Sequence, residues 1–358
     1  MFKQMLKRGA AFLCLAAALA LPVYAQETRV QEVTPQTTVQ EYHDNPTLKA
    51  AGFWTYTRDK SAKDQEKWKD KTLSEYMGEN VVDDCVAAVN QLMHNYVNGI
   101  QVTYKVYSDD EIAADASKDK TELYYYPADA SYGKTKYAVV LCGNIYTQTE
   151  EVKEGAAVAY QLNQKGYTAF VLRYRTWRDM KDNAPAEDLG NAIRYITSHA
   201  DQFNVDTEDY AVIGFSSGGH LAGLFGGDKL SYKTFGVPKP GALILAYAVN
   251  YFLEGVPVYH TVIDDMALGR RYYDYSITGA VNDNYPPVYR FYGRDDLVYK
   301  LMVMELQGPS LTRALQRHNI PYEEEVFDNA PHGCGLGNGT DAAGWLDRAV
   351  DFWQQQTA

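Results

Sequence analysis

Cysteine is scarce in this chain, with 4 residues among 358. Cys14 lies in the N-terminal apolar run, so Cys85, Cys142 and Cys334 are the cysteines of the remaining chain. An odd number of cysteines excludes a disulfide framework and leaves at least one thiol free or intermolecular. We expect three free thiols, with a Cys142–Cys334 disulfide as the alternative.

The chain also lacks an excess of positive charge, since 34 Lys and Arg residues face 46 Asp and Glu, a net charge of −12. Such a protein attracts neither nucleic acid nor an anionic membrane surface, and neutral small molecules or polysaccharides suit it better as partners. No metal-ligand spacing and no phosphate-binding glycine loop with a lysine occurs in the sequence. We therefore expect no metal and no cofactor, and the oligomeric state stays open.

Uncharged stretches of membrane length are missing as well. The apolar run Ala10–Leu21 is short for a membrane span, follows basic residues and leads to Ala25, a small residue that suits signal-peptidase cleavage. Residues 1–25 are therefore predicted to be an export signal. The mature protein would be secreted or periplasmic and would have no membrane span.

The segment after the export signal divides into two predicted parts. Residues 26–60 begin with a stretch rich in Gln, Thr and Glu that has no regular periodicity, and we expect a flexible tether there. Residues 61–99 are predicted to be a helical extension. Its apolar residues between Val81 and Tyr96 recur at helical spacing, and Asn98-Gly99 ends the helix. This helix could pack on the core or fold over the active site as a cap.

Residues 100–358 are predicted to form one catalytic domain of the α/β class. Two strands, at 100–107 and 123–126, form an antiparallel start to the sheet. Apolar strands and amphipathic helices then alternate, which predicts a mostly parallel sheet with helices on both faces. The expected strands are 137–142, 168–174, 210–215, 242–247, 288–292 and 322–327, and the expected helices are 151–165, 185–200, 217–225, 309–318 and 342–355.

The chemistry is predicted to centre on the sequence Gly214-Phe215-Ser216-Ser217-Gly218. It joins a short apolar strand to a helix of small residues, the context of a nucleophile elbow. In such an elbow the serine occupies a strained turn with its hydroxyl exposed, and glycines keep the flanks clear where strand and helix nearly collide. Ser216 is therefore the candidate nucleophile.

A serine nucleophile needs a base and an acid that orients the base, and at such elbows the acid precedes the histidine in the chain. Asp296 follows the predicted strand 288–292, and His332 lies in a glycine-rich loop after the last strand. Asp295 is the competing acid, but we favour Asp296 because the acid usually stands three residues after the glycine of such a turn. Activity should then require a neutral histidine and rise with pH.

An oxyanion formed during acyl transfer needs backbone N–H donors. We expect one from Ser217 and others from the loop Gly143, Asn144 and Ile145, which follows the predicted strand 137–142. Of the other histidines, His220 is expected to pack behind the elbow, and His260 could contact substrate.

Several motifs together resemble the α/β-hydrolase esterases of the acetyl-xylan esterase and feruloyl-esterase-like group, related to hormone-sensitive-lipase-type and prolyl-oligopeptidase-type hydrolases. The motifs run in order from about Tyr137 to the C-terminus: Ala169–Arg175, Asp188-Leu189, Gly214–Ala222, Tyr285-Pro286-Pro287, Gly293–Asp296 and His332–Gly335. The resemblance implies the α/β-hydrolase fold, with Ser216 as nucleophile, Asp296 as acid and His332 as base. The sequence departs from the group at Asn144 and Ile145, where similar proteins carry glycines.

The leading hypothesis is a secreted serine esterase that removes short acyl groups, foremost acetyl, from carbohydrates. A serine peptidase of the same fold and a carbohydrate-binding protein that has lost its activity are the alternatives. Near the site, Arg173 and Arg175 are expected to form structural salt bridges with Asp188.

Overall fold

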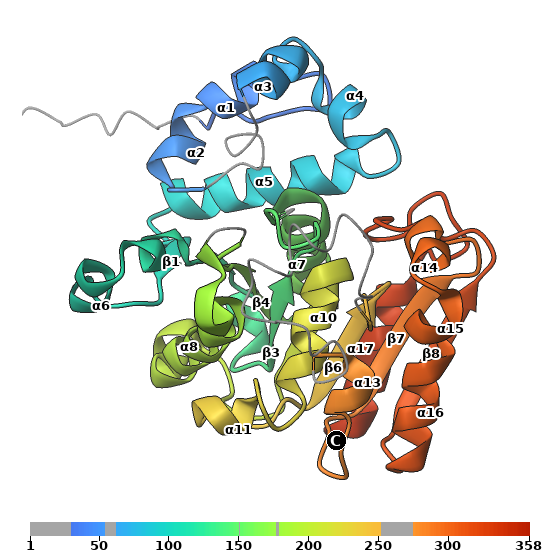
Figure 1. The fold of residues 1–358 in the computed structure, drawn as a ribbon. Helices are drawn as coiled ribbons and strands as arrows, with labels where there is room; N and C mark the ends of the chain where they lie inside the picture. The colour runs from blue at the N-terminus through green and yellow to red at the C-terminus, as the bar shows by residue number, and fades with distance from the viewer. Residues whose placement is uncertain (1–29, 54–61, 150, 177–178, 252–274) are drawn as a thin grey trace, which may run out of the picture.

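An eight-stranded sheet forms the centre of the molecule (Figure 1). The computed structural model describes residues 30–53, 62–149, 151–176, 179–251 and 275–358. Within them the strand order is β1-β2-β4-β3-β5-β6-β7-β8; β2 pairs antiparallel with β1 and β4, and every other pair is parallel. The strands are β1 (Thr103–Lys105), β2 (Glu122–Tyr126), β3 (Tyr137–Leu141), β4 (Thr168–Arg173), β5 (Ala211–Phe215), β6 (Ala242–Ala246), β7 (Val288–Gly293) and β8 (Tyr322–Phe327).

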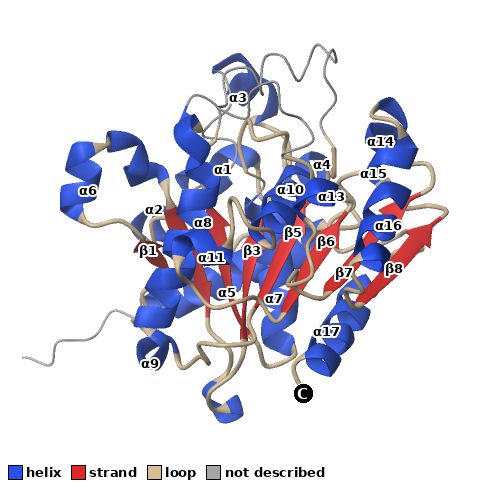
Figure 2. Cartoon of the chain, turned by 60° about the horizontal axis from the view of Figure 1, so that its bottom comes forward, coloured by secondary structure: helices blue, strands red, loops and turns tan. Residues whose placement is uncertain are grey.

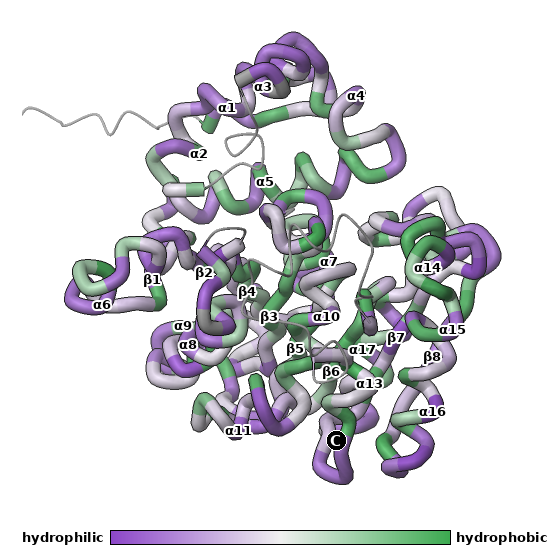
Figure 3. The backbone as a smooth tube through the Cα atoms, in the orientation of Figure 1, coloured by the Kyte–Doolittle hydropathy of each residue, from purple (hydrophilic) through white to green (hydrophobic). Residues whose placement is uncertain are grey.

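The central strands are buried on both faces, which explains their uninterrupted apolar sequences. Along β3, Tyr137, Val139 and Leu141 belong to one hydrophobic cluster, whereas Ala138 and Val140 belong to a second cluster on the opposite face. Figure 3 shows these strands as hydrophobic, in contrast to the mostly hydrophilic helices α1 (Val39–Asp44) and α3 (Ala62–Trp68). The two clusters are the two halves of the core.

Helices cover both faces of the sheet (Figure 2). The first face packs against α8 (Ala184–Ser198), α9 (Ala200–Phe203), α10 (Ser216–Phe225), α11 (Tyr232–Phe235), α13 (Ile277–Ala280) and α16 (Pro309–Arg317). The second face packs against α5 (Val82–Val97), α7 (Ala157–Gln164) and α17 (Trp345–Gln356). The shorter α6 (Asp109–Ala114), α14 (Leu297–Leu301) and α15 (Met304–Gln307) lie at connections, with 3₁₀ turns at 116–120, 130–132 and 181–183. This arrangement confirms the predicted α/β class.

Residues 30–53 are folded, which differs from the flexible tether expected at 26–60. The helix α1 begins at a capping box in which Thr38 and Glu41 satisfy each other's backbone N–H groups, and Asn45 caps α2 (Pro46–Ala50). Side chains from this segment, including Leu48 and Phe53, are buried in the second cluster. The polar residues that we interpreted as evidence of a tether cap these helices or lie on their exposed faces. The remaining residues of the expected tether, 26–29 and 54–60, lie outside the described ranges.

The predicted amphipathic helix of the extension is α5, and it ends at Asn98 as expected. It packs against α7 and against a π-helical turn, η4 (Glu151–Ala156), that directly precedes α7. Asp84 on α5 accepts hydrogen bonds from Gln161 (2.7 Å) and Asn338 (2.6 Å). The extension, which also contains α4 (Leu73–Met77), therefore belongs to the core on the second face. In the described part of the chain, no helix combines the length and the apolar character that crossing a membrane requires.

Candidate active site

The elbow at Ser216 has the geometry that its glycines predict. Ser216 follows β5, has a φ of 50° and begins α10. A Cβ on Gly214 would lie 2.4 Å from the Gly218 carbonyl oxygen, and a Cβ on Gly218 would lie 2.3 Å from the Leu141 carbonyl oxygen. Because any side chain would collide with backbone there, both glycines are needed to form the turn.

The structure brings Ser216, His332 and Asp296 together from the carboxyl ends of three strands. The Ser216 Oγ lies 2.8 Å from His332 Nε2, and His332 Nδ1 lies 2.8 Å from Asp296 Oδ2. The second oxygen of Asp296 accepts the Tyr299 N–H at 3.0 Å, as expected of a helix N-cap. In this arrangement Nδ1–H donates to the carboxylate, and Nε2 can accept the serine proton.

Asp295, the competing acid, lies elsewhere. Its side chain is 79% exposed and forms an ion pair with Lys300 at 2.6 Å, whereas Asp296 is fully buried. The Lys300 hydrogen bond lowers the pKa of Asp295. Of the two aspartates, only Asp296 is in contact with a histidine through a hydrogen bond described in the structure.

The loop that was expected to supply oxyanion donors is held in an unusual backbone conformation. Asn144, Ile145 and Tyr146 have φ values of 117°, 52° and 57°. These left-handed conformations are costly for residues with side chains, most of all for a β-branched residue such as Ile145. The Tyr146 N–H donates to Ser217 Oγ at 3.2 Å, and the Tyr146 hydroxyl lies 2.8 Å from His220 Nδ1.

Gly143 does not fit its predicted role as an oxyanion donor. Its N–H donates to the Glu154 carboxylate at 2.6 Å, so this group is already used inside the protein. The position still requires glycine, because a Cβ would lie 2.7 Å from the Ser216 Cβ. Asn144, Ile145 and Ser217 remain the predicted oxyanion donors.

His220 packs behind the elbow, as expected. Its Nε2 lies 2.6 Å from the Tyr275 carbonyl oxygen and donates to it, which leaves Nδ1 to accept from Tyr146. Burial lowers the pKa of His220 to about 4, because the charged imidazolium is poorly solvated there. His260 lies outside the described residues.

The predicted salt bridge forms with one of the two arginines. Arg175 contacts buried Asp188 at 2.7 Å, whereas Arg173 lies 3.5 Å from Glu122 and 3.8 Å from Glu151. The two arginines differ because Arg173 is the last residue of β4, whereas Arg175 lies beyond the strand, where its backbone N–H also donates to Asp188 at 2.7 Å. The Arg175 pair thereby links the segment after β4 to α8.

Sequence reasoning missed two residues next to Ser216 and His332. Glu154, on the π-helical turn, accepts the Gly143 N–H, and Tyr247 places its ring centroid 5.1 Å from that of His332. Tyr247 directly follows β6, so its place at the carboxyl edge of a parallel strand was a usable signal. For Glu154, the signal was a glutamate followed at once by Gly-Ala-Ala-Val-Ala, a run typical of a buried helix.

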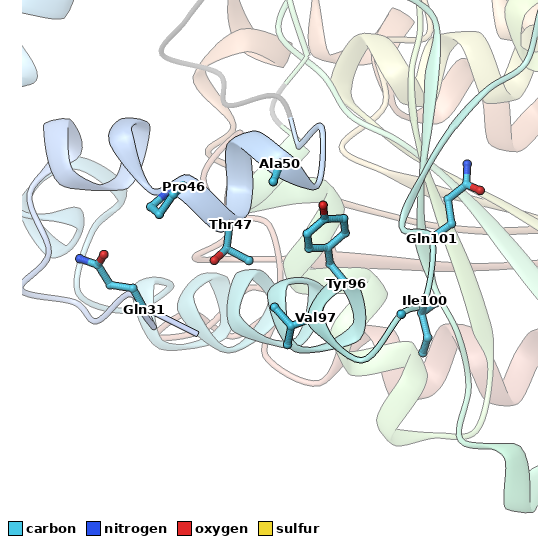
Figure 4. A pocket seen from close by; sticks show the side chains of 9 residues that line it. Gln31, Pro46, Thr47, Ala50, Tyr96, Val97, Ile100 and Gln101 are labelled. Carbon is cyan, nitrogen blue, oxygen red and sulfur yellow. The ribbon is translucent and has the colours of Figure 1, made fainter. Parts of the chain in front are cut away.

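A pocket of about 790 Å³ lies in the N-terminal part of the molecule (Figure 4). Thr47 and Ala50 of α2 face Tyr96 and Val97 of α5 across it, and its lining includes none of Ser216, Asp296 and His332. Elsewhere in the described residues, no group of three or more His, Cys, Asp or Glu side chains could hold a metal ion.

The chain is similar to esterases and xylan-degrading enzymes. The BD-FAE family model matches residues 123–235, a stretch that contains Ser216 and ends before Asp296 and His332. Endo-1,4-beta-xylanase B of Butyrivibrio fibrisolvens is 26% identical over 205 residues, covering 54% of this chain and 31% of that protein. An acetylxylan esterase of Xylanibacter ruminicola is 25% identical over 203 residues, covering 54% of this chain and 40% of that protein. The matches thus span less than half the length of these relatives.

Solved structures give the same picture of the fold. An acetyl ester-xyloside bifunctional hydrolase from Caldicellulosiruptor lactoaceticus matches with a TM-score of 0.60 and 25% identity, over 71% of this chain and 95% of that one. A carboxylesterase from Lactobacillus plantarum matches with a TM-score of 0.57 and 20% identity, over 66% and 92%. These matches confirm the α/β-hydrolase fold and the predicted resemblance to acetyl-xylan-esterase-like hydrolases.

Proposed function

We propose that this protein is an exported serine esterase that removes short acyl groups, foremost acetyl, from carbohydrates. The observation that carries the proposal is the pair of 2.8 Å contacts that link Ser216 to His332 and His332 to Asp296. The likeness to an acetylxylan esterase and to an acetyl ester-xyloside hydrolase supports acetylated sugars as the substrate class. The N-terminal pattern of an export signal supports a substrate outside the cytoplasm.

In the proposed reaction Ser216 Oγ attacks the carbonyl carbon of the ester, and its proton passes to His332 Nε2. The negative charge on the carbonyl oxygen is stabilised by backbone N–H groups of Ser217 and of Asn144 or Ile145. The intermediate collapses when the sugar oxygen leaves with the proton from His332, which leaves an acylated serine. A water molecule then gives a proton to His332 and attacks the acyl carbon, and Ser216 recovers that proton as the free acid departs.

Asp296 acts on the histidine in both halves of the reaction. Its carboxylate holds Nδ1–H, which selects the tautomer with a lone pair on Nε2, and it stabilises the imidazolium that forms. The Tyr299 N–H fixes the other carboxylate oxygen, so that the acid cannot rotate away from His332.

Substrate comparison tests the proposal against its alternatives. We expect hydrolysis of 4-nitrophenyl acetate and acetate release from acetylated xylan, with kcat/KM falling from acetate to butyrate to octanoate. An aminoacyl nitroanilide as the better substrate would favour a peptidase, and no turnover of either would favour a binding protein. Octanoate hydrolysed as well as acetate, or no acetate from any acetylated glycan, would contradict the carbohydrate-deacetylase assignment.

A further inference from the structure

Glu154 is a buried carboxylate beside Ser216 that the proposed reaction does not use. Only 5% of the residue is exposed. Its two oxygens accept hydrogen bonds from separate parts of the chain: the Gly143 N–H donates to Oε2 at 2.6 Å, and the Tyr247 hydroxyl donates to Oε1 at 2.9 Å. One carboxylate therefore ties the loop after β3 to the segment after β6.

Tyr247 extends this connection to the loop that carries His332. Its hydroxyl oxygen accepts the Gly335 N–H at 3.0 Å, and its ring packs beside the His332 ring. Tyr247 is 1% exposed and has a φ of 36°, a left-handed conformation that a β-carbon makes unfavourable. The indole N–H of Trp345 donates to the Gly335 carbonyl oxygen at 3.0 Å, so both backbone groups of Gly335 are hydrogen-bonded to buried side chains.

Burying the Glu154 carboxylate is energetically unfavourable, so packing alone is a poor explanation for this hydrogen-bonded connection. Burial raises the pKa of Glu154, which means that desolvation works against the charged form that both donors favour. A carboxylate removed from water costs several kcal/mol unless its contacts compensate, and an apolar side chain of similar size would avoid that cost. A buried position that keeps such a group is a candidate for a functional one.

We propose that Glu154 and Tyr247 are positioning residues, which hold the oxyanion loop at Gly143 and the histidine loop at Gly335 in fixed positions relative to each other. We call these two residues and their hydrogen bonds to Gly143 and Gly335 the brace. The inference rests on the proposed esterase function. The Gly143 peptide touches Ser216, since a Cβ there would lie 2.7 Å from the Ser216 Cβ. With the Gly143 N–H fixed on Glu154, the N–H groups of the next two residues are held toward one wall of the site, while Tyr247 sets the tilt of His332.

Loss of the brace should slow the chemical step and leave substrate binding nearly unchanged. A shift of about 1 Å in a reacting or stabilising group can cost about 10²-fold in rate. We expect Tyr247→Phe, which keeps the ring and removes the oxygen, to lower kcat on 4-nitrophenyl acetate about 10-fold. Glu154→Ala should lower it about 100-fold, and Glu154→Gln should recover part of the loss, because its amide oxygen can still accept the Gly143 N–H.

Glu151→Gln is the matched control. Glu151 lies on the same π-helical turn and is 1% exposed, but its described partners are the Thr149 hydroxyl and Arg173, rather than Gly143, Tyr247 or Gly335. Its substitution should lower Tm and leave kcat unchanged. The rate of inactivation by phenylmethylsulfonyl fluoride, which reports on Ser216 without a sugar or acyl subsite, should follow kcat in every variant.

The outcomes separate the brace from the proposed function. A wild-type protein that neither hydrolyses esters nor reacts with the sulfonyl fluoride would overturn both. An active wild type whose Tyr247→Phe and Glu154→Gln variants keep kcat, or change only KM or Tm, would overturn the brace alone. The Tyr247→Phe/Glu154→Gln double variant should lose less than the product of the single losses, and strictly multiplicative losses would also contradict a shared brace.

Discussion

At the scale of single residues, the proximity of Ser216, His332 and Asp296 could be predicted from sequence because each belongs to a motif with a fixed order along the chain. The contact between Glu154 and Tyr247 could not, since it joins residues that lie 93 positions apart. No local pattern records which donors will face a buried carboxylate. The Gly143 prediction failed for the same reason, because the partner of its N–H comes from another element.

Substitution of the two neighbouring aspartates gives a matched test of the proposed acid. We expect Asp296→Asn to lower kcat by about 10⁴-fold, because an amide favours the wrong histidine tautomer. Asp295→Asn removes only an exposed ion pair and should leave kcat unchanged. Steady-state kinetics on 4-nitrophenyl acetate decide between them, and a larger loss at Asp295 would contradict the assignment.

Ser216→Ala should abolish ester hydrolysis while the protein keeps its fold. Ser216 Oγ contacts His332, and the alanine that replaces it fills almost the same volume in the turn. Losses on the order of 10⁶-fold accompany removal of a serine nucleophile that acts with a histidine. Circular dichroism and kcat should be measured on the same sample; turnover close to that of the wild type would rule out Ser216 as nucleophile.

The buried neutral His220 should make the folded protein less stable in acid. Its pKa is lowered to about 4, so the unfolded chain takes up the proton first as the pH falls below the ordinary histidine value of about 6.5. The contribution of neutral His220 to the free energy of unfolding is fully present above about pH 6.5 and is lost as the pH falls toward about 4. The total loss is up to about 3 kcal/mol. Urea unfolding of the wild type and of His220→Asn should show their difference in free energy shrinking over this range. A constant difference would contradict a buried neutral imidazole.

At the scale of elements, periodicity predicted the strands and the longer helices to within a few residues, whereas most of the short helices were not predicted. The last strand, Tyr322–Phe327, begins and ends where it was predicted to. The π-helical turn at Glu151–Ala156 was missed, because its apolar residues also satisfy the α-helical pattern that we expected from 151. The distinction depends on hydrogen bonds to residue i+5, which composition does not encode.

The oxyanion loop should tolerate glycine at its β-branched residue better than an unstrained position does. Ile145 has a φ of 52° and is 37% exposed, so Ile145→Gly relieves backbone strain, which offsets part of the buried surface that is lost. We expect it to lower the free energy of unfolding by about 1 kcal/mol less than the same change at an equally exposed isoleucine without that strain. Ile100→Gly is the control, because Ile100 is 36% exposed and is not among the described residues with positive φ. A similar loss of stability in both variants would contradict the strain.

At the scale of the whole molecule, the parallel sheet and its helical layers followed from the alternation of strands and helices. The place of the N-terminal segment did not, because its short helices carry few apolar residues, and α2 and α4 pack on α5, which itself packs on the distant α7. The capping boxes at Thr38 and Thr72 are sequence motifs from which the folding of the N-terminal segment could have been predicted.

Removal of the N-terminal extension should prevent stable folding. α5 alone buries Val82, Cys85, Val89, Leu92 and Met93. At about 1.5–3 kcal/mol for each large side chain, their loss is comparable to the total stability of a typical domain. A chain that begins at residue 101 should bind a hydrophobic dye and unfold without a cooperative transition, whereas one that begins at residue 26 should not. Full esterase activity and cooperative unfolding of the shorter chain would show that the extension is dispensable.

The π-helical turn also has a consequence for insertions and deletions. A π turn holds one residue more than an α turn, and one residue corresponds to a rotation of about 100° around a helix axis. Deletion of Lys153 would convert the turn to regular α-helix and rotate the segment on its N-terminal side relative to Glu154 and the rest of α7. A loop transferred from a relative whose turn lacks the extra residue would be rotated in the same way relative to Glu154. The length of this turn, as much as its sequence, must therefore be preserved when the loop after β3 is redesigned.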